Sequence, residues 1–250
     1  MKKLLFLLLT GTLLLATSCK DDEEMNAIFT DDAAELIAAS IGSNSGGAAQ
    51  YIGVSANISA TSNELKSASL VVVLADSTYS DSGTITSAAS GNIGTWSYGW
   101  DYLLTYDAAA QHVNSSFTYS GEVDLPRFSS APHGSGNFVY ANLIQAGTAS
   151  TLNTVWLMNG DFTRTAIHNS KVTSKQITST SVVEFQDCEV TTDGTRRIVS
   201  GLAYITITGT VPNQGSFEYT ATVTFGSGSY GTLNIDGKTY TISIEEGQVQ

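Results

Sequence analysis

The C-terminal part of the chain alternates between apolar and polar residues with a period of two. The apolar set is Phe217, Tyr219, Ala221, Val223 and Phe225, and the polar set is Glu218, Thr220, Thr222 and Thr224. This period places the apolar side chains on one face of a β-strand and leaves the other face to water. Asp236-Gly237 predicts a two-residue hairpin turn that pairs Ile235 with Lys238. Turn and alternation agree on the register, so an antiparallel sheet is the strongest constraint on the fold.

The predicted strands, including those at the C-terminal end, are separated by Gly, Ser, Asn and Asp. They cover 95–106, 116–123, 137–144, 151–165, 177–190, 197–208, 216–225, 231–235 and 238–244. Leu70 to Leu74 is a continuous apolar run, which is typical of a strand buried on both faces, and the hydroxyl-rich segment 76–92 is expected to be a loop. Apolar residues make up 42% of the 250 and charged residues 14%, which excludes a wholly disordered chain.

Helical periodicity occurs only near the N-terminus. A stripe formed by Ala33, Leu36, Ile37 and Ile41 stops at Gly42, and a second helix is expected from Ala48 to about Asn63. The predicted fold class is mainly β: an antiparallel sandwich or a partly closed barrel with a short N-terminal helical element. We assign 1–18 to a signal peptide, 19–30 to an acidic tether, 31–66 to the helical element and 67–250 to a β-rich domain.

The first nineteen residues have the pattern of an export signal. Met1-Lys2-Lys3 precedes an apolar region of 12 residues, Leu4 to Leu15, which is too short to span a membrane. Ala16-Thr17-Ser18-Cys19 follows and resembles the lipobox of bacterial lipoproteins, in a variant typical of the Bacteroidota. The resemblance implies cleavage before Cys19 and a lipid on its sulfur and amino group, which makes the membrane a partner. The alternative is an ordinary secretory signal followed by a chance cysteine.

An acidic run follows that cysteine directly. Lys20, Asp21, Asp22, Glu23 and Glu24 resemble the signal that sends lipoproteins of the Bacteroidota to the outer cell surface. This implies a protein anchored in the outer membrane and facing the exterior. The alternative is an acidic linker on a protein that faces the periplasm. The net charge of −12 argues against nucleic acid as a partner, because binding to phosphates requires a basic surface.

One predicted strand carries an unusual row of aromatic residues. Trp96, Tyr98, Trp100, Tyr102 and Tyr106 project from one face of this strand. Aromatic rings stack on the apolar faces of sugars, so these five residues form a hypothetical glycan-binding site. The alternative is that the row is the core face of a central strand, because the opposite face carries Thr95, Ser97, Gly99, Asp101 and Thr105, which are typical of a face exposed to solvent.

Three functional hypotheses remain open from the sequence. A non-enzymatic binding role is favoured, with a glycan or an envelope protein as the partner, because no nucleophile motif is present. One alternative is a hydrolase of envelope or polysaccharide material, with Asp101 and Glu122 as its candidate carboxylates. The other is a structural or assembly component of a surface complex. No cofactor is expected.

Cysteine and histidine residues give no sign of a metal or a redox site. Once Cys19 carries lipid, Cys188 has no disulfide partner, and Asp187 and Glu189 beside it raise the pKa of a thiol, so we expect a buried, unreactive side chain. His112, His133 and His168 are too far apart in sequence to share a helix turn or a strand face, and we interpret them as surface or turn residues.

A modification site is predicted within the expected loop. Asp76-Ser77-Thr78 resembles the O-glycosylation site of envelope proteins from the Bacteroidota. The resemblance implies that Ser77 carries a glycan.

Overall fold

Alternating burial divides the sheet of this protein into an inner and an outer face. Strand β6 (Gln176–Thr191), for example, alternates between exposed and buried residues along most of its length. The structure is a computed structural model and describes residues 27–61, 71–87, 91–107, 110, 112–142, 155–172, 174–192, 198–226 and 228–250. Burial follows the period-two pattern of the sequence because successive side chains of a strand point to opposite faces.

Two helices precede the strands in the described residues. They are α1 (Thr30–Ile41) and α2 (Ala48–Thr61). The strands are β1 (Val71–Ser87), β2 (Gly91–Asp107), β3 (His112–Asp124), β4 (Phe128–Asn142), β5 (Val155–Ser170), β6, β7 (Ile198–Val211), β8 (Gly215–Phe225), β9 (Tyr230–Ile235), β10 (Lys238–Ser243) and β11 (Gln248–Val249). They form one 11-stranded sheet in chain order, so each strand lies beside the next one in sequence.

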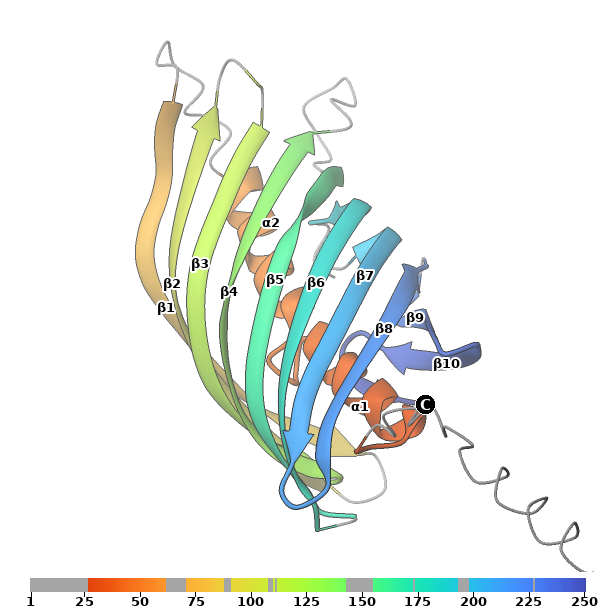
Figure 1. The fold of residues 1–250 in the computed structure, drawn as a ribbon. Helices are drawn as coiled ribbons and strands as arrows, with labels where there is room; N and C mark the ends of the chain where they lie inside the picture. Colours follow the sequence, from red (N-terminus) through yellow and green to blue (C-terminus); the bar gives the residue numbers. More distant parts are fainter. Residues whose placement is uncertain are drawn as a thin grey trace, which may run out of the picture.

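The sheet curves around the two helices, which lie along its inner face (Figure 1). Buried residues of both helices and of the inner face form one hydrophobic core. The predicted fold class is therefore confirmed: the protein is mainly β and antiparallel, with a short helical element at the N-terminal side. The strands belong to one continuous curved sheet, and within the described residues its edge strands β1 and β11 do not pair with each other.

Helix α1 lies deep in the core because it is apolar on most of its circumference. Eight of its 12 residues are buried, many of them alanines, whose small side chains permit close contact with the sheet. The turn to α2 is closed by Ser45, whose hydroxyl donates to the carbonyl oxygens of Ala39 at 2.8 Å and Gly42 at 3.0 Å. The helical element and the sheet thus share one core.

Two expectations for the first strand were wrong. The described residues of the segment 76–92 are strands and not a loop, because β1 and β2 pair from Val71 opposite Asp107 to Ser87 opposite Gly91, apart from two register shifts. The N-terminal end of β1 is not buried on both faces either, since Val73 is 58% exposed. Pairing with β2 imposes the strand despite the hydroxyl-rich composition, and none of the elements in the described residues covers the outer face of the sheet.

The expected C-terminal hairpin is confirmed in its register. Ile235 pairs with Lys238 and Leu233 with Tyr240, on either side of the turn at Asp236-Gly237. Both turn residues have positive φ, 48° and 73°, as a type I′ turn requires. The other predicted strands are present with shifted ends. The largest shift is in β4, which begins at Phe128 and not near residue 137.

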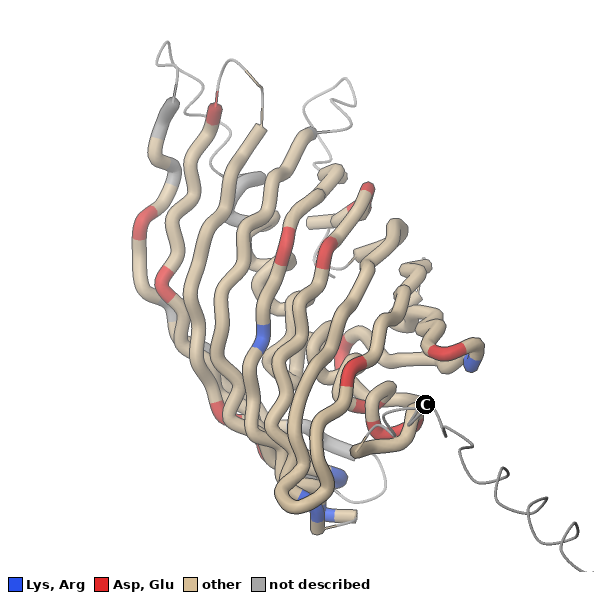
Figure 2. Tube along the Cα trace, viewed as in Figure 1, with Lys and Arg blue, Asp and Glu red and all other residues tan. Residues whose placement is uncertain are grey.

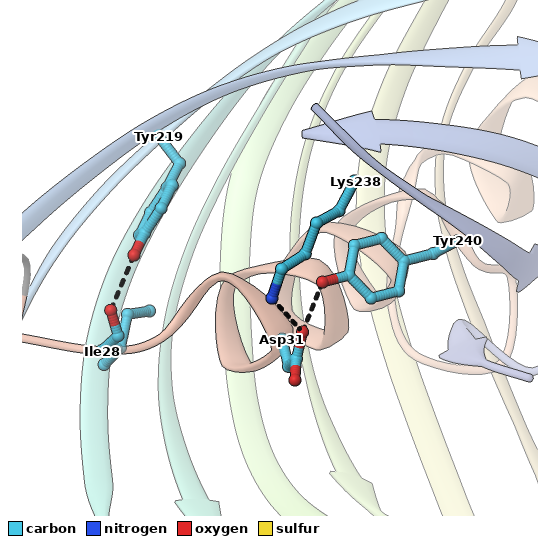
Figure 3. Close-up of polar contacts among 5 residues, drawn as sticks. All are labelled: Ile28, Asp31, Tyr219, Lys238 and Tyr240. Carbon is cyan, nitrogen blue, oxygen red and sulfur yellow. Dashed lines mark hydrogen bonds and ion pairs between the residues drawn. The ribbon is translucent and has the colours of Figure 1, made fainter. Parts of the chain in front are cut away.

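The segment before α1 is fixed to the C-terminal strands. The Ala27 amide donates to the Ser216 carbonyl oxygen at 3.0 Å, and the buried Tyr219 hydroxyl donates to the Ile28 carbonyl oxygen at 2.7 Å. Figure 3 shows the second attachment, where Lys238 and the Tyr240 hydroxyl both contact the Asp31 carboxylate. Residues 27–30, which the sequence assigned to the tether, therefore belong to the folded body.

Candidate functional site

The predicted aromatic row lies on the inner face of β2. Tyr98 is 2% exposed and Trp100 is 4% exposed, whereas Trp96, Tyr102 and Tyr106 are partly buried against the core. The Tyr51 ring of helix α2 meets the Trp100 ring edge-on at a centroid distance of 5.2 Å, and the Tyr98 hydroxyl donates to the Asn44 carbonyl oxygen, in the turn between the helices, at 2.8 Å. These five residues do not form an exposed platform for stacking on sugars. Tyr98 and Trp100 instead belong to the core face of the strand, because the helical element packs on them and leaves no room for a ligand.

An exposed aromatic residue lies instead on the outer face, on β7. Tyr204 is 42% exposed and occupies a cross-strand row with Glu184 on β6, Thr222 on β8 and Asn234 on β9. The row lines a shallow hollow of about 460 Å³, which we call the Tyr204 hollow. Its volume lies within the range of small-ligand sites. Tyr204 thus lies between the Glu184 carboxylate and the Thr222 hydroxyl, with the Asn234 amide one strand beyond Thr222.

The polar groups of the Tyr204 hollow complement its ring chemically. Thr206 and Thr220 line the next row, opposite each other on β7 and β8. The Asn234 side-chain oxygen accepts a hydrogen bond from the Thr239 hydroxyl at 2.8 Å, which fixes the amide and leaves its NH₂ group as the remaining donor. The hollow therefore offers donors and acceptors around a face that can stack on an apolar surface.

A second, more open depression lies on the outer face of β1 to β4. Cross-strand rows of short side chains form it: Ser80 pairs with Gly99 and Gly99 with Ser120, while Ser82 pairs with Ser97 and Ser97 with Glu122. It measures about 720 Å³. It is lined by hydroxyl groups and by Glu122, and no exposed aromatic ring stands in it.

The two carboxylates proposed for hydrolysis are widely separated. Asp101 pairs with Thr118 and accepts a hydrogen bond of 2.6 Å from the Thr78 hydroxyl, whereas Glu122 lies four residues further along β3. Four residues of a strand span roughly 13 Å. Glycosidase carboxylates lie about 5–9.5 Å apart, so this pair does not match the geometry of either mechanism.

A buried polar cluster lies on the inner face of β5, where the sequence predicts no site. Arg164 is 1% exposed and His168 is 3% exposed. Arg164 Nη1 lies 3.0 Å from His168 Nε2, and Nη2 donates to the Ser45 carbonyl oxygen at 3.2 Å and to the Ser130 hydroxyl at 3.4 Å. The guanidinium thereby holds the turn between α1 and α2 on the sheet.

Arg164 also fixes the protonation of His168. A guanidinium can only donate, so Nε2 accepts and the hydrogen of the neutral ring resides on Nδ1. Burial, and then the charge of Arg164, hold the pKa of His168 well below its ordinary value. The expectation of a surface or turn residue was therefore wrong for His168, whereas His133 is exposed.

A small pocket leads from the surface to His168. It measures about 140 Å³ and lies between α1 and the ends of β4, β5 and β6, with Leu36 and Phe128 among its walls. Glu35 and Arg127 form a salt bridge of 3.0 Å beside it. Burial is the main cause that raises the pKa of Glu35. The pocket is smaller than typical ligand sites.

The other residues that the sequence singled out lie in separate parts of the chain. Cys188 is buried as expected, and burial raises its pKa to about 12, which keeps the thiol protonated. Ser77 lies on the strand β1 and not in a loop, with its side chain exposed. Cys19 and the acidic run Lys20, Asp21, Asp22, Glu23 and Glu24 lie outside the described residues. Among the residues that the structure describes, no cluster of His, Cys, Asp or Glu has the geometry of a metal site.

Two residues that the sequence did not single out, Tyr204 and Arg164, break the alternation of their strands. Tyr204 occupies an outward position of β7, between the inward Ala203 and Ile205, where polar residues prevail. Arg164 occupies an inward position of β5, two residues from the buried Phe162. The sequence signal that could have identified them is an aromatic residue at an outward, normally polar position of a strand, or a charged residue at an inward, normally apolar position.

Comparison with known proteins gives no match: no family model, no curated protein and no solved structure is significantly similar to this chain. None of the helices in the described part of the chain has the length and hydrophobicity to cross a membrane. Functional inference therefore rests on the residues and their geometry.

Proposed function

We propose that this protein is a lipid-anchored lipoprotein of the bacterial outer membrane that faces the exterior and binds a glycan without transforming it. Two observations support the two halves of the proposal. The lipobox-like segment that ends at Cys19 supports the anchor. The Tyr204 hollow supports the binding role, and the side chains that line it are the reason for proposing a glycan as the ligand.

Polyhydroxylated ligands match the groups in the Tyr204 hollow. Sugar rings present apolar faces to an aromatic ring and hydroxyl groups at their edges, which pair with carboxylates, amides and hydroxyls. Glu184 and Asn234 lie at opposite ends of the row that contains Tyr204. The wide separation of Asp101 and Glu122 favours binding over glycoside hydrolysis.

The proposed anchor keeps the body close to the membrane. Ala27, the first described residue, is hydrogen-bonded to β8. Even a fully extended chain from Cys19 to Ala27 spans at most about 28 Å. The acidic residues within this tether repel an anionic surface, which suits a body held just outside it.

Lipidation is tested by labelling cells that express the full chain with a palmitate analogue. We expect Cys19→Ser to abolish the label and Cys188→Ser to retain it. Protease treatment of intact cells then tests orientation: the wild type is digested, whereas neutral substitutions at Asp21, Asp22, Glu23 and Glu24 protect the protein. Label that remains on Cys19→Ser contradicts the anchor.

Glycan binding is tested by affinity electrophoresis of the full chain, in a mild detergent, through gels that contain xylan, mannan or starch. We expect retardation in at least one gel, with Tyr204→Ala lowering the affinity about tenfold and Tyr204→Phe preserving it. Tyr230→Ala is the matched control, because Tyr230 is 53% exposed but does not line the hollow. Equal retardation of Tyr204→Ala and the wild type excludes the hollow as the site.

A further inference from the structure

The Arg164 guanidinium is a buried positive charge without a negative partner among the described residues. No Asp or Glu is among the buried polar residues, which are mostly serines together with Arg164 and His168. Burial lowers the pKa of Arg164, yet an arginine remains protonated in proteins. An unpaired buried charge is strongly unfavourable, so a compensating negative charge is required.

Unused hydrogen-bond donors surround this charge. Arg164 Nε and the hydroxyls of Tyr51, Tyr119 and Ser181 are buried and have no hydrogen-bond partner. Tyr51 and Tyr119 are in ring contact, with centroids 4.5 Å apart. Burial raises the pKa of both tyrosines, so neither hydroxyl supplies the missing negative charge.

The register of the sheet brings these donors together. Tyr119 on β3 pairs with Gly134 on β4, Gly134 pairs with Arg164 on β5, and Arg164 pairs with Ser181 on β6. A Cβ atom on Gly134 would lie 3.1 Å from Tyr119 Cε1, so the tyrosine ring leans over the glycine toward Arg164. Gly134 has no side chain that would separate the Tyr119 ring from Arg164.

Helix α2 adds positive potential at the same place. Arg164 Nη2 donates to the carbonyl oxygen of Ser45, three residues before the helix begins, and Tyr51 lies in its first turn. The amide groups of a first helical turn have no partner within the helix, and the helix dipole is positive there. Guanidinium, hydroxyls and helix terminus all favour a negative ion.

We propose that Arg164, Tyr51 and Tyr119 form an internal binding site for a small monovalent inorganic anion of the chloride type. The anion accepts hydrogen bonds from Arg164 Nε and from the two tyrosine hydroxyls and neutralises the guanidinium. Contact between the surrounding aromatic rings restricts the site to an ion of halide size. The anion thereby joins α2 to the centre of the sheet.

Thermal unfolding of the full chain in a mild detergent tests the site. Sodium chloride is exchanged for sodium gluconate at constant ionic strength, because gluconate is too large to enter. At a chloride concentration about ten times the dissociation constant, we expect the midpoint temperature of unfolding to rise by about 3–6 °C relative to gluconate. Equal midpoints in both salts would overturn the proposal.

Variants assign the effect to the residues named. Arg164→Met removes the charge while nearly keeping the volume, and Tyr119→Phe removes one hydroxyl; we expect the first to abolish the chloride response and the second to weaken it. Arg127→Met, which removes an exposed arginine paired with Glu35, retains the response. A full response in Arg164→Met overturns the proposal.

A direct measurement is independent of how well the variants fold. Crystals of the wild type grown in sodium bromide are expected to give an anomalous peak beside Arg164 Nε, within contact of Tyr51 and Tyr119. Bromide found elsewhere, with no peak at Arg164, overturns the assignment.

Discussion

The ring of Tyr98 lies across Gly121, its cross-strand neighbour on β3. A Cβ atom on Gly121 would lie 2.2 Å from Tyr98 Cδ1, so only glycine fits beneath the ring. The same arrangement occurs where Trp96 faces Gly83 and where Phe117 faces Gly136. Glycines opposite aromatic residues thus let large rings lie flat on the inner face, which leaves room for the helices.

Replacing Gly121 is expected to destabilise the protein strongly. In Gly121→Ala the new methyl group meets the Tyr98 ring and, at 2.6 Å, the Ser97 carbonyl oxygen, so the strand must shift. We expect the free energy of unfolding to fall by about 2–3 kcal/mol in urea titrations. Gly226→Ala is the control, because nothing lies within 4 Å of its Cβ position. A Gly121→Ala protein as stable as this control contradicts the packing.

Protonation of His168 is expected to make stability depend on pH. Its pKa is lowered in the folded state, so below the ordinary histidine pKa of about 6.5 the unfolded chain binds a proton that the folded protein does not. The free energy of unfolding should therefore fall from pH 6.5 downwards, by up to about 1.4 kcal/mol per pH unit. Urea titrations from pH 7.5 to 5 measure this slope.

Variants of two histidines test whether His168 causes this dependence of stability on pH. His168→Gln keeps an acceptor for Arg164 and should lose most of the dependence, whereas His133→Gln, an exposed control, should keep it. An unchanged slope in His168→Gln means that another group titrates.

Removing the charge of Glu35 is expected to stabilise the protein at neutral pH. The folded state raises the pKa of Glu35 mainly through burial, so ionisation costs stability as the pH rises above about 4.5, despite the Arg127 salt bridge. Glu35→Gln should raise the free energy of unfolding at pH 7 by less than about 1 kcal/mol, and the gain should disappear below about pH 4. Glu122→Gln, on the outer face, serves as the control. A loss of stability in Glu35→Gln means that the ion pair outweighs burial.

The two tyrosines in Figure 3 are expected to differ in their contribution to stability. Tyr219→Phe leaves the Ile28 carbonyl oxygen without its buried partner and should cost about 1–2 kcal/mol. Tyr240→Phe removes a contact to the exposed Asp31 and should cost less than about 0.5 kcal/mol. Hydrogen exchange should also show faster opening of the segment before α1 in Tyr219→Phe alone. Equal losses in the two variants contradict this ranking.

Charge is distributed unevenly between the two faces of the sheet. Figure 2 shows acidic residues spread over several strands, with few basic residues among them. Among the described residues, Arg164 and His168 are the ionisable groups of Arg, Lys, His, Asp and Glu that are fully buried. The total charge of the sequence is therefore a poor guide to the site, because the one buried guanidinium acts in a medium that screens it little.

The amino-acid sequence by itself determined the strands, their alternation and the register of the last hairpin. These are local properties: side chains of a strand alternate in direction whatever lies around them, and Asp236-Gly237 accepts the positive φ of its turn. The sequence could not assign 76–87 to a strand, because its hydroxyl-rich composition has no strand signal of its own and pairing with β2 imposes that structure.

Only the tertiary structure decided what each face of the sheet meets. Helix α2 and the turn before it occupy the inner face, so Tyr98 and Trp100 are core residues, while Tyr204 is exposed on a face that no described element covers. Arg164 entered the interior because its position on β5 points inward, beside the turn between the helices. Alternation assigns a residue to one face of the sheet. Which face is buried, and which charged groups a residue meets on it, depend on contacts between segments far apart in the sequence.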